Sequence, residues 1–305
     1  MTSRDELLAT TSRTFALAIP LLPEPTRLAV RTAYLLFRIA DTFEDAAAWS
    51  RADRVAALHE LVGILDRVDV EAARARAEAW AAAGASDHPG YVDLLRHTPD
   101  VLEDLASLDA PARGVVKRHA IRTAEGMARV VSSGDASGKL QLDDVEALRA
   151  YCYVVAGIVG ELLTELFVVH CPSLSAVQAE LEGTQIAFGE GLQLVNILKD
   201  VADDARDGRR YVPTGARQQL LGLARDDLRQ AELYVAALAR GGAPRGFLAF
   251  TAFPLLLARD TLDRLAVDGP GAKVGRARVA ALLAHVHAAP LEDGPSTLLA
   301  GPTAA

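Results

Sequence analysis

The stretch from Phe188 to Pro213 (FGEGLQLVNILKDVADDARDGRRYVP) constrains the fold most, because polar residues recur at helical spacing within an apolar pattern. The apolar residues indicate a buried helix. The polar residues follow one another at intervals of three or four positions, which places them on roughly one face; they are Gln193, Asn196, Asp200 and Asp204. Two carboxylates one turn apart, ~6 Å along the axis, can share a hard divalent cation, so the sequence predicts a metal site.

A second acidic cluster has the same spacing far upstream, in the segment FRIADTFED. Asp41 and Asp45 are four positions apart, and we expect them on a helix that runs from near Pro25 to about Ala47. An isolated pair of this kind is most often a solvated helix face. Both clusters interrupt apolar runs, however, and this favours function. Four carboxylates facing each other across a bundle core would bind Mg²⁺ bridged to a phosphate-rich ligand.

The composition favours an all-α protein. Half of the residues are apolar, aromatic residues make up 5%, and β-branched runs are rare. Nothing in the 305 residues resembles a linker, so we expect one helical domain over residues 1–289. Residues 290–305 carry Gly, Pro, Ser and Thr without periodicity, which predicts a disordered tail.

Charge, cysteines and hydropathy limit the partners and the compartment. A net charge of −8 without a basic stripe argues against nucleic acid. Cys152 and Cys171 show no zinc or disulfide spacing and fit a reducing cytoplasm. The N-terminus lacks the apolar region of a signal peptide. The segment Tyr151 to Val169 is interrupted by Glu161 and Glu165, so we expect no transmembrane anchor.

Four blocks stand out along the chain: Ser12 to Phe15 (SRTF), Tyr34 to Asp45, Tyr151 to Gly160, and Gly191 to Pro213. In their order and approximate spacing they resemble the squalene/phytoene synthase family, which joins two prenyl diphosphates head to head on an all-α isoprenoid synthase fold. The resemblance is greatest to bacterial squalene synthase-like members, and it implies a helical bundle with a central apolar tunnel.

The sequence departs from the family pattern at two positions. Thr14 stands where the family usually has Ser, and Lys199 stands where it usually has Arg. The first change keeps the hydroxyl group and the second keeps the charge. Lys cannot make the bidentate phosphate contact of Arg, however.

The resemblance implies roles for further residues. The SRTF block contacts a substrate diphosphate in the family, although helix caps would also explain Ser12 and Thr14. Tyr151 resembles the family's tyrosine near the reacting carbons, where it would orient the diphosphate or help remove a proton; a buried core tyrosine is the alternative. The predicted substrate-binding residues are Ser12, Arg13, Thr14, Phe15, Tyr34, Arg38, Gln193, Asn196, Arg209 and Tyr211, and the predicted catalytic residues are Tyr151, Asp41, Asp45, Asp200 and Asp204.

Two further segments suggest how a substrate would be held. The basic turn from Arg206 to Tyr211 could close over diphosphate oxygens, and a solvated loop is the alternative. Ala156, Gly157 and Gly160 would let another helix, or a prenyl chain, approach the segment that follows Tyr151.

The C-terminal third bears on a reductant. Phe250 to Leu262 and Lys273 to Arg276 resemble squalene synthases, in which the corresponding region lies near a nicotinamide cofactor. No G-x-G-x-x-G fingerprint follows a strand, so the resemblance alone implies NADPH.

The leading interpretation is condensation of two farnesyl diphosphates through presqualene diphosphate to squalene, with Mg²⁺ and NADPH as cofactors. Alternatives are an enzyme that stops at presqualene diphosphate or forms dehydrosqualene or phytoene without a reductant, a terpene cyclase of the same fold, and a non-catalytic prenyl diphosphate-binding protein. We expect a cytoplasmic protein, with peripheral membrane contact for an apolar product. Substrate chain length, final product and oligomeric state stay open.

Overall fold

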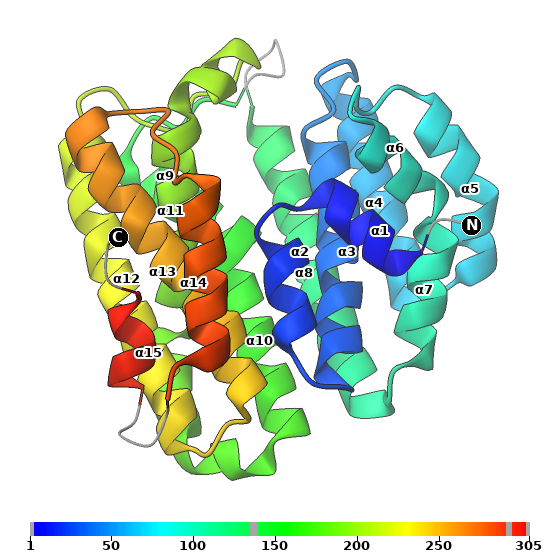
Figure 1. Cartoon of the computed structure of the whole chain (residues 1–305). Coiled ribbons are helices and arrows are strands. Elements are labelled where there is room, and N and C mark those ends of the chain that lie inside the picture. Colours follow the sequence, from blue (N-terminus) through cyan, green and yellow to red (C-terminus); the bar gives the residue numbers. More distant parts are fainter. Residues whose placement is uncertain (1–2, 135–139, 291–294, 303–305) are drawn as a thin grey trace. The chain divides into compact units, whose positions relative to one another are not determined.

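The computed structural model describes residues 3–134, 140–290 and 295–302, and within these ranges the protein is built from helices joined by short turns (Figure 1). The described residues form no strand. Gln141 and Arg210 form an isolated β-bridge. The prediction of an all-α fold is therefore confirmed.

Backbone contacts divide the chain into two compact units, residues 1–19 with 24–140 and residues 20–23 with 141–305. That residues 1–289 form one domain stays a prediction. The helices of the first unit are α1 (Arg4–Thr11), α2 (Phe15–Ala18), α3 (Thr26–Glu44), α4 (Arg51–Arg67), α5 (Val70–Ala82), α6 (Pro89–Arg96), α7 (Thr98–Ser107) and α8 (Ala110–Ser133), and η1 (Ile19–Leu21) follows α2.

The helices of the second unit begin with α9 (Val145–Cys152), the π-helical segment η2 (Tyr153–Gly157), α10 (Ile158–His170) and η3 (Pro172–Val177). They continue with α11 (Gln178–Arg206), α12 (Arg217–Arg240), α13 (Arg245–Asp268), α14 (Arg276–Ala288) and α15 (Ser296–Ala300).

Helix α3 forms the centre of the first unit, where it packs against α4, α6, α7 and α8. It ends at Glu44, three residues before the expected Ala47, so Asp45 is the C-cap rather than an internal residue. Phe43 is fully buried and its ring lies 5.8 Å from the ring of Trp49. Because this stacking needs the chain to turn back immediately after Asp45, the helix cannot continue.

Helix α11 forms the centre of the second unit, where it packs against α10, α12 and α13. Glycines permit its closest contacts. A Cβ atom on Gly160 would lie 1.9 Å from the carbonyl oxygen of Gln185, and one on Gly189 would lie 2.0 Å from the carbonyl oxygen of Ala156. The small residues after Tyr151 therefore let a neighbouring helix approach, which is one of the two alternatives that the sequence predicts; the other is a prenyl chain.

Residues 295–302 differ from the expected disordered tail. Ser296–Ala300 forms α15, and Leu298 is buried. The carbonyl oxygen of Leu299 accepts a hydrogen bond from Arg259 at 2.8 Å, and that of Pro302 accepts one from Arg278 at 2.7 Å. One buried leucine and two arginine contacts thus order a segment that has no long apolar pattern of its own.

Candidate functional site

The SRTF block lies between α1 and α3 in the first unit. The Ser12 hydroxyl accepts a hydrogen bond from the Phe15 amide at 2.9 Å, so Ser12 caps the turn that opens α2. The Phe15 ring lies 5.6 Å from that of Tyr34, and the Tyr34 hydroxyl donates to the carbonyl of Thr11 at 3.0 Å. The block is therefore fixed to α3 one turn before Arg38.

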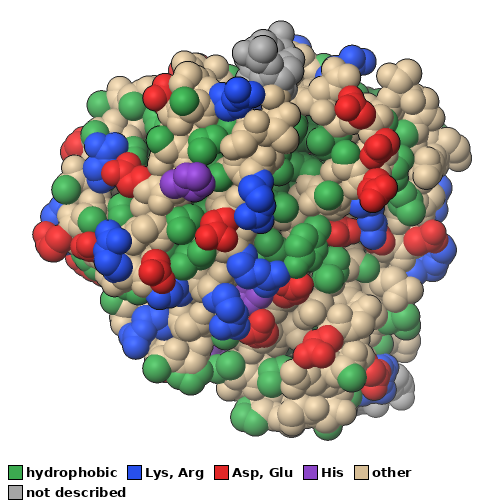
Figure 2. Space-filling model, turned by 180° about the vertical axis from the view of Figure 1, so that it is seen from behind, with side chains coloured by type: hydrophobic (Ala, Val, Ile, Leu, Met, Phe, Trp, Pro, Cys, Tyr) green, Lys and Arg blue, Asp and Glu red, His purple; other side chains and the backbone are tan. Residues whose placement is uncertain are grey.

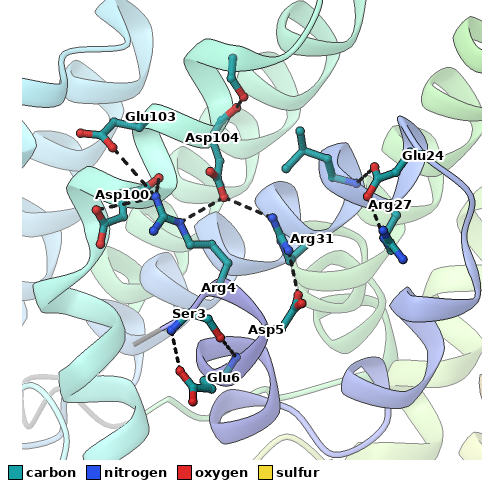
Figure 3. A network of polar contacts seen from close by, with 12 residues as sticks. Ser3, Arg4, Asp5, Glu6, Glu24, Arg27, Arg31, Asp100, Glu103 and Asp104 are labelled. Atoms are coloured by element: carbon teal, nitrogen blue, oxygen red, sulfur yellow. Dashed lines mark hydrogen bonds and ion pairs between the residues drawn. The ribbon is translucent and has the colours of Figure 1, made fainter. Parts of the chain in front are cut away.

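A polar network holds α1 against α3 and α7 and so fixes the start of this block (Figure 3). Arg4 lies 3.4 Å from Asp104, Arg31 lies 3.6 Å from the same carboxylate, and Arg31 also pairs with Asp5 at 2.7 Å. Two guanidinium groups share the Asp104 carboxylate, yet burial still raises its pKa. These contacts position the backbone that leads to Ser12.

Arg38 and Asp41 form the charged centre of the first acidic motif. Arg38 lies 3.1 Å from the Asp41 carboxylate, and its guanidinium lies 5.7 Å from the ring centre of Tyr34 and 5.4 Å from that of Tyr91. Burial raises the pKa of Asp41 to about 6, the charge of Asp45 adds to the shift, and Arg38 opposes it. Asp41 keeps 29% of its side chain exposed, so a ligand can reach it.

The second acidic motif lies in the last third of α11. Lys199 donates to Asp200 at 2.7 Å, and Arg209 lies 3.6 Å from Asp204. The four side chains are between 17% and 34% exposed. These carboxylates are thus accessible and each has a cationic neighbour, as a site for an anionic ligand requires.

The basic turn follows α11 directly and is tied to its end. The Arg209 amide donates to the carbonyl of Asp204 at 2.8 Å, and the Leu142 amide donates to the carbonyl of Arg210 at 3.0 Å. Gly208 has a φ of 79°, which explains why a glycine stands at this turn. The predicted turn around Gly208 is present, and its backbone is hydrogen-bonded on both sides.

Tyr151 and Tyr211 meet although they are far apart in the sequence. Their ring centres lie 4.9 Å apart in a stacked arrangement, and the Tyr151 hydroxyl donates to the Tyr211 hydroxyl at 3.2 Å. Both side chains are buried. The structure thus brings together two predicted site residues of the second unit, and it also agrees with the alternative that Tyr151 is a hydrogen-bonded core residue.

The remaining predicted residues lie on α11 and just before α2. Gln193 and Asn196 are on α11 before Asp200, the first partly buried and the second exposed. Thr14 is the N-cap of α2 and makes no side-chain capping bond, whereas Arg13 is exposed.

Sequence reasoning missed two contacts of the acidic motifs. Tyr91 on α6 contacts Arg38, and the Gly271 amide donates to the carbonyl of Lys199 at 2.9 Å. Gly271 has a φ of 85°, so its glycine is a signal in the sequence for an unusual turn. Lys199, which this turn contacts, lies 72 positions earlier in the sequence (271 − 199), so residue spacing could not identify the contact.

The C-terminal block that resembles squalene synthases divides into two parts. Phe250 and Phe253 are buried on α13, and the ring of Phe250 lies 6.3 Å from that of Phe167. This part belongs to the core of the second unit. The loop that precedes Arg276 instead contacts α11 at Lys199, beside the acidic motif.

The donors of the two motifs fit a hard cation. Carboxylate oxygens are the ligands that Mg²⁺ prefers, and each motif carries two aspartates. Among the described residues, no group of three or more His, Cys, Asp or Glu side chains is arranged to hold a metal ion. A bound cation would therefore need oxygens from a ligand and from water as well.

Within the part of the chain that the structure describes, one helical segment, Val145–His170, meets the length and composition of a membrane span, and half of its most apolar window is buried within the protein. Core helices of globular proteins meet the same criterion. On the face drawn in Figure 2, acidic and basic side chains are interspersed.

The chain matches a known family model and several curated proteins. The family model described as squalene/phytoene synthase matches residues 8–216, which include all four blocks. A probable squalene synthase of Neurospora crassa is 27% identical over 206 residues, and a squalene synthase of Schizosaccharomyces pombe is 28% identical over 216 residues. Each alignment covers 68% of this chain but only 40% and 43% of the relatives, so the chain spans less than half of their length.

Solved structures share the fold. TcSQS in complex with the ligand E5700 superposes with a TM-score of 0.75 at 22% identity, covering 97% of this chain and 87% of the other. A dehydrosqualene synthase in complex with a ligand gives a TM-score of 0.58 at 20% identity, covering 93% and 94%. At these identities the likeness concerns the fold alone.

Proposed function

Because the chain belongs to the squalene/phytoene synthase family, whose members are prenyltransferases, we propose that it condenses two farnesyl diphosphates head to head, through presqualene diphosphate, to squalene. The observation that carries this proposal is the pairing of each acidic motif with a cation, Arg38 with Asp41 and Lys199 with Asp200. The curated relatives described as squalene synthases support squalene as the product.

Asp41, Asp45, Asp200 and Asp204 would hold Mg²⁺. When bound, the metal would neutralise the charge of the leaving diphosphate and so favour ionisation of the allylic carbon–oxygen bond. The proposal takes support from the accessible carboxylates.

Protein cations would bind the diphosphate itself. Arg38 packs against two tyrosine rings, which preorganises its guanidinium group for phosphate oxygens. Arg209 follows the end of α11 on a turn that can adjust to them. Gln193 and Asn196 would orient the diphosphate or its water molecules. Preorganised donors stabilise the developing charge without reorganising during the reaction.

The fate of the final cation decides the product. A hydride from NADPH would give squalene, whereas loss of a proton would give dehydrosqualene. Dehydrosqualene is the alternative product. It is favoured by the stacked rings and hydrogen-bonded hydroxyls of Tyr151 and Tyr211, which offer a buried oxygen that can accept a proton. An apolar tunnel, which stays a prediction, would keep water from the cation.

The protein would act in the cytoplasm, and an apolar product would require it to touch a membrane at release. Residues 145–170 are apolar enough to take part, but their partial burial favours a core role.

Product analysis tests the proposal. The protein is incubated with Mg²⁺ and farnesyl or geranylgeranyl diphosphate, with and without NADPH, and extracts are examined by mass spectrometry. We expect squalene from farnesyl diphosphate with NADPH, and presqualene diphosphate or an unsaturated hydrocarbon without it. An identical product distribution in both arms would contradict the reductive step, and a product made from one farnesyl unit would contradict condensation.

A further inference from the structure

Three charged residues meet in the second unit away from the acidic motif. Arg149 on α9 lies 2.8 Å from Glu190 on α11 and also forms an ion pair with Asp227 on α12. The two carboxylate side chains are 5% and 9% exposed, and the arginine is 35% exposed. We call these residues the charged triad.

The charged triad is a poor device for stability. It places two carboxylates beside one guanidinium, and burial raises the pKa of Glu190 to about 7 and raises that of Asp227 despite the arginine. Apolar residues of similar volume often stabilise such a place as well or better. We therefore infer that the charged triad specifies one arrangement of the three helices rather than adding stability.

The helices around the charged triad approach one another closely at glycines. Gly189 lies against the backbone of Ala156, and a Cβ atom on Gly191 would lie 3.0 Å from the Cβ of Asp227. An arginine that reaches carboxylates on two helices ties the three helices together, because its planar fork must meet both carboxylates at once.

The segment that the charged triad fixes carries Tyr151. Arg149 lies two positions before Tyr151, and the π-helical segment η2 begins two positions after it. Glu190 also lies close to η2. Its Oε1 atom, the carboxylate oxygen not paired with Arg149, would be 3.4 Å from a Cβ atom built on Gly157. Single π-helical turns recur at functional sites, where they redirect a side chain.

We propose that Arg149, Glu190 and Asp227 are positioning residues, which lock α9 and η2 against α11 so that Tyr151 stacks on Tyr211 in the orientation the reaction needs. As a statement about turnover, this inference rests on the proposed function. Its structural part, the placement of the Tyr151 ring, does not.

The test compares Arg149→Met with Arg149→Lys and with the control Asp226→Asn. Asp226 neighbours Asp227 on α12, but it is 60% exposed and pairs with an exposed arginine. The placement of Tyr151 is read from the ring carbon signals of protein labelled at its six tyrosines, with the Tyr151→Phe variant assigning the signal. Turnover of farnesyl diphosphate gives kcat and KM separately.

Arg149→Met should move the Tyr151 signal and lower kcat about 10- to 100-fold with KM within about threefold, since small displacements of catalytic groups have effects of this size. Arg149→Lys should recover part of both losses, and Asp226→Asn should leave both unchanged. If Arg149→Met does not fold, the isosteric Glu190→Gln replaces it, with a smaller shift in the same direction.

An unmoved Tyr151 signal in the folded variant would overturn the inference, and so would a kcat equal to that of the control. If the wild-type protein does not turn over farnesyl diphosphate, the proposed function fails, but the tyrosine signal still decides whether the charged triad places Tyr151.

Discussion

The two acidic motifs hold their carboxylates by different means. In the first, the cation beside Asp41 is Arg38, which two tyrosine rings hold in place. In the second, the cation beside Asp200 is its chain neighbour Lys199, on a flexible stem, and Asp204 is approached from the following turn by Arg209. The first motif is thus preset by packing, whereas the second depends on side chains and a turn that can adjust to a ligand.

This difference concerns rigidity rather than exposure, because Asp41 and Asp200 are similarly accessible at 29% and 34%. In the proposed reaction, a preset motif would orient a diphosphate firmly, and an adjustable motif would accommodate the change of charge as a diphosphate leaves. We therefore expect equal effects from replacing Asp41 or Asp200, and different effects from replacing the cations beside them, Arg38 and Lys199.

Removing one carboxylate from either motif should have the largest effect. Asp41→Asn and Asp200→Asn each remove a charge without removing volume, and we expect turnover to fall at least about 100- to 1000-fold in both while far-UV circular dichroism keeps its helical signal. Near-wild-type turnover in either variant would remove that motif from the metal site.

Replacing the preset cation should have the next largest effect. Arg38→Lys keeps the charge but loses the planar group between the rings of Tyr34 and Tyr91, and we expect kcat/KM to fall about 10- to 100-fold. Tyr91→Leu provides the matched check, because it should produce a weaker loss in the same direction. Full activity in Arg38→Lys would show that the first motif is no more preset than the second.

Removing one hydroxyl from the tyrosine pair should have an intermediate effect. Tyr151→Phe keeps the stacked ring and deletes the donor of the hydrogen bond to Tyr211, so we expect a kcat about tenfold lower with an unchanged KM. Steady-state kinetics with farnesyl diphosphate provide the comparison. An unaltered kcat would assign Tyr151 to the core.

Glu190 is a buried carboxylate of the second unit that lies outside the acidic motif. Its titration should change the free energy of unfolding with pH. Its pKa is raised to about 7 from 4.5, so the folded state holds a proton that the unfolded state releases between these values. The free energy of unfolding should therefore fall as pH rises from about 4.5 to 7, by an amount on the order of 1 kcal/mol.

Urea unfolding at several pH values measures this slope. In Glu190→Gln the slope should be reduced, because the titrating group is gone. An identical slope in the two proteins would mean that the carboxyl group is not shielded as the structure indicates.

Changing the adjustable cation should have the smallest effect. Lys199→Arg introduces the residue usual in the family at a position 25% exposed, and we expect kcat/KM to stay within about threefold. A loss as large as that of Arg38→Lys would show that the second motif is as tightly preset as the first.

Local patterns predicted the helices and the acidic motifs. Spacing placed Asp200 and Asp204 on one helix, and the start expected near Pro25 lies one residue before the observed start of α3 at Thr26. These features depend on residues within one or two turns of each other, where sequence determines geometry directly.

Contacts between distant segments could not be predicted. Nothing near Arg149 in the sequence indicates Glu190 or Asp227, and nothing near Arg38 indicates Tyr91, since each partner comes from another helix. The end of α3 at Glu44 also depends on such a contact, the stacking of Trp49 on Phe43. Tertiary packing decides these features, and a single sequence does not specify it locally.

The most direct test of head-to-head condensation mixes two isotopic forms of farnesyl diphosphate. Equal amounts of unlabelled and fully deuterated substrate are incubated with Mg²⁺ and the protein, and the products are weighed by mass spectrometry. The account predicts thirty-carbon products built from two unlabelled units, from one unit of each kind and from two labelled units, with the mixed species the most abundant. Products that carry only all or none of the label, on fifteen carbons, would contradict it and identify an enzyme that acts on a single diphosphate.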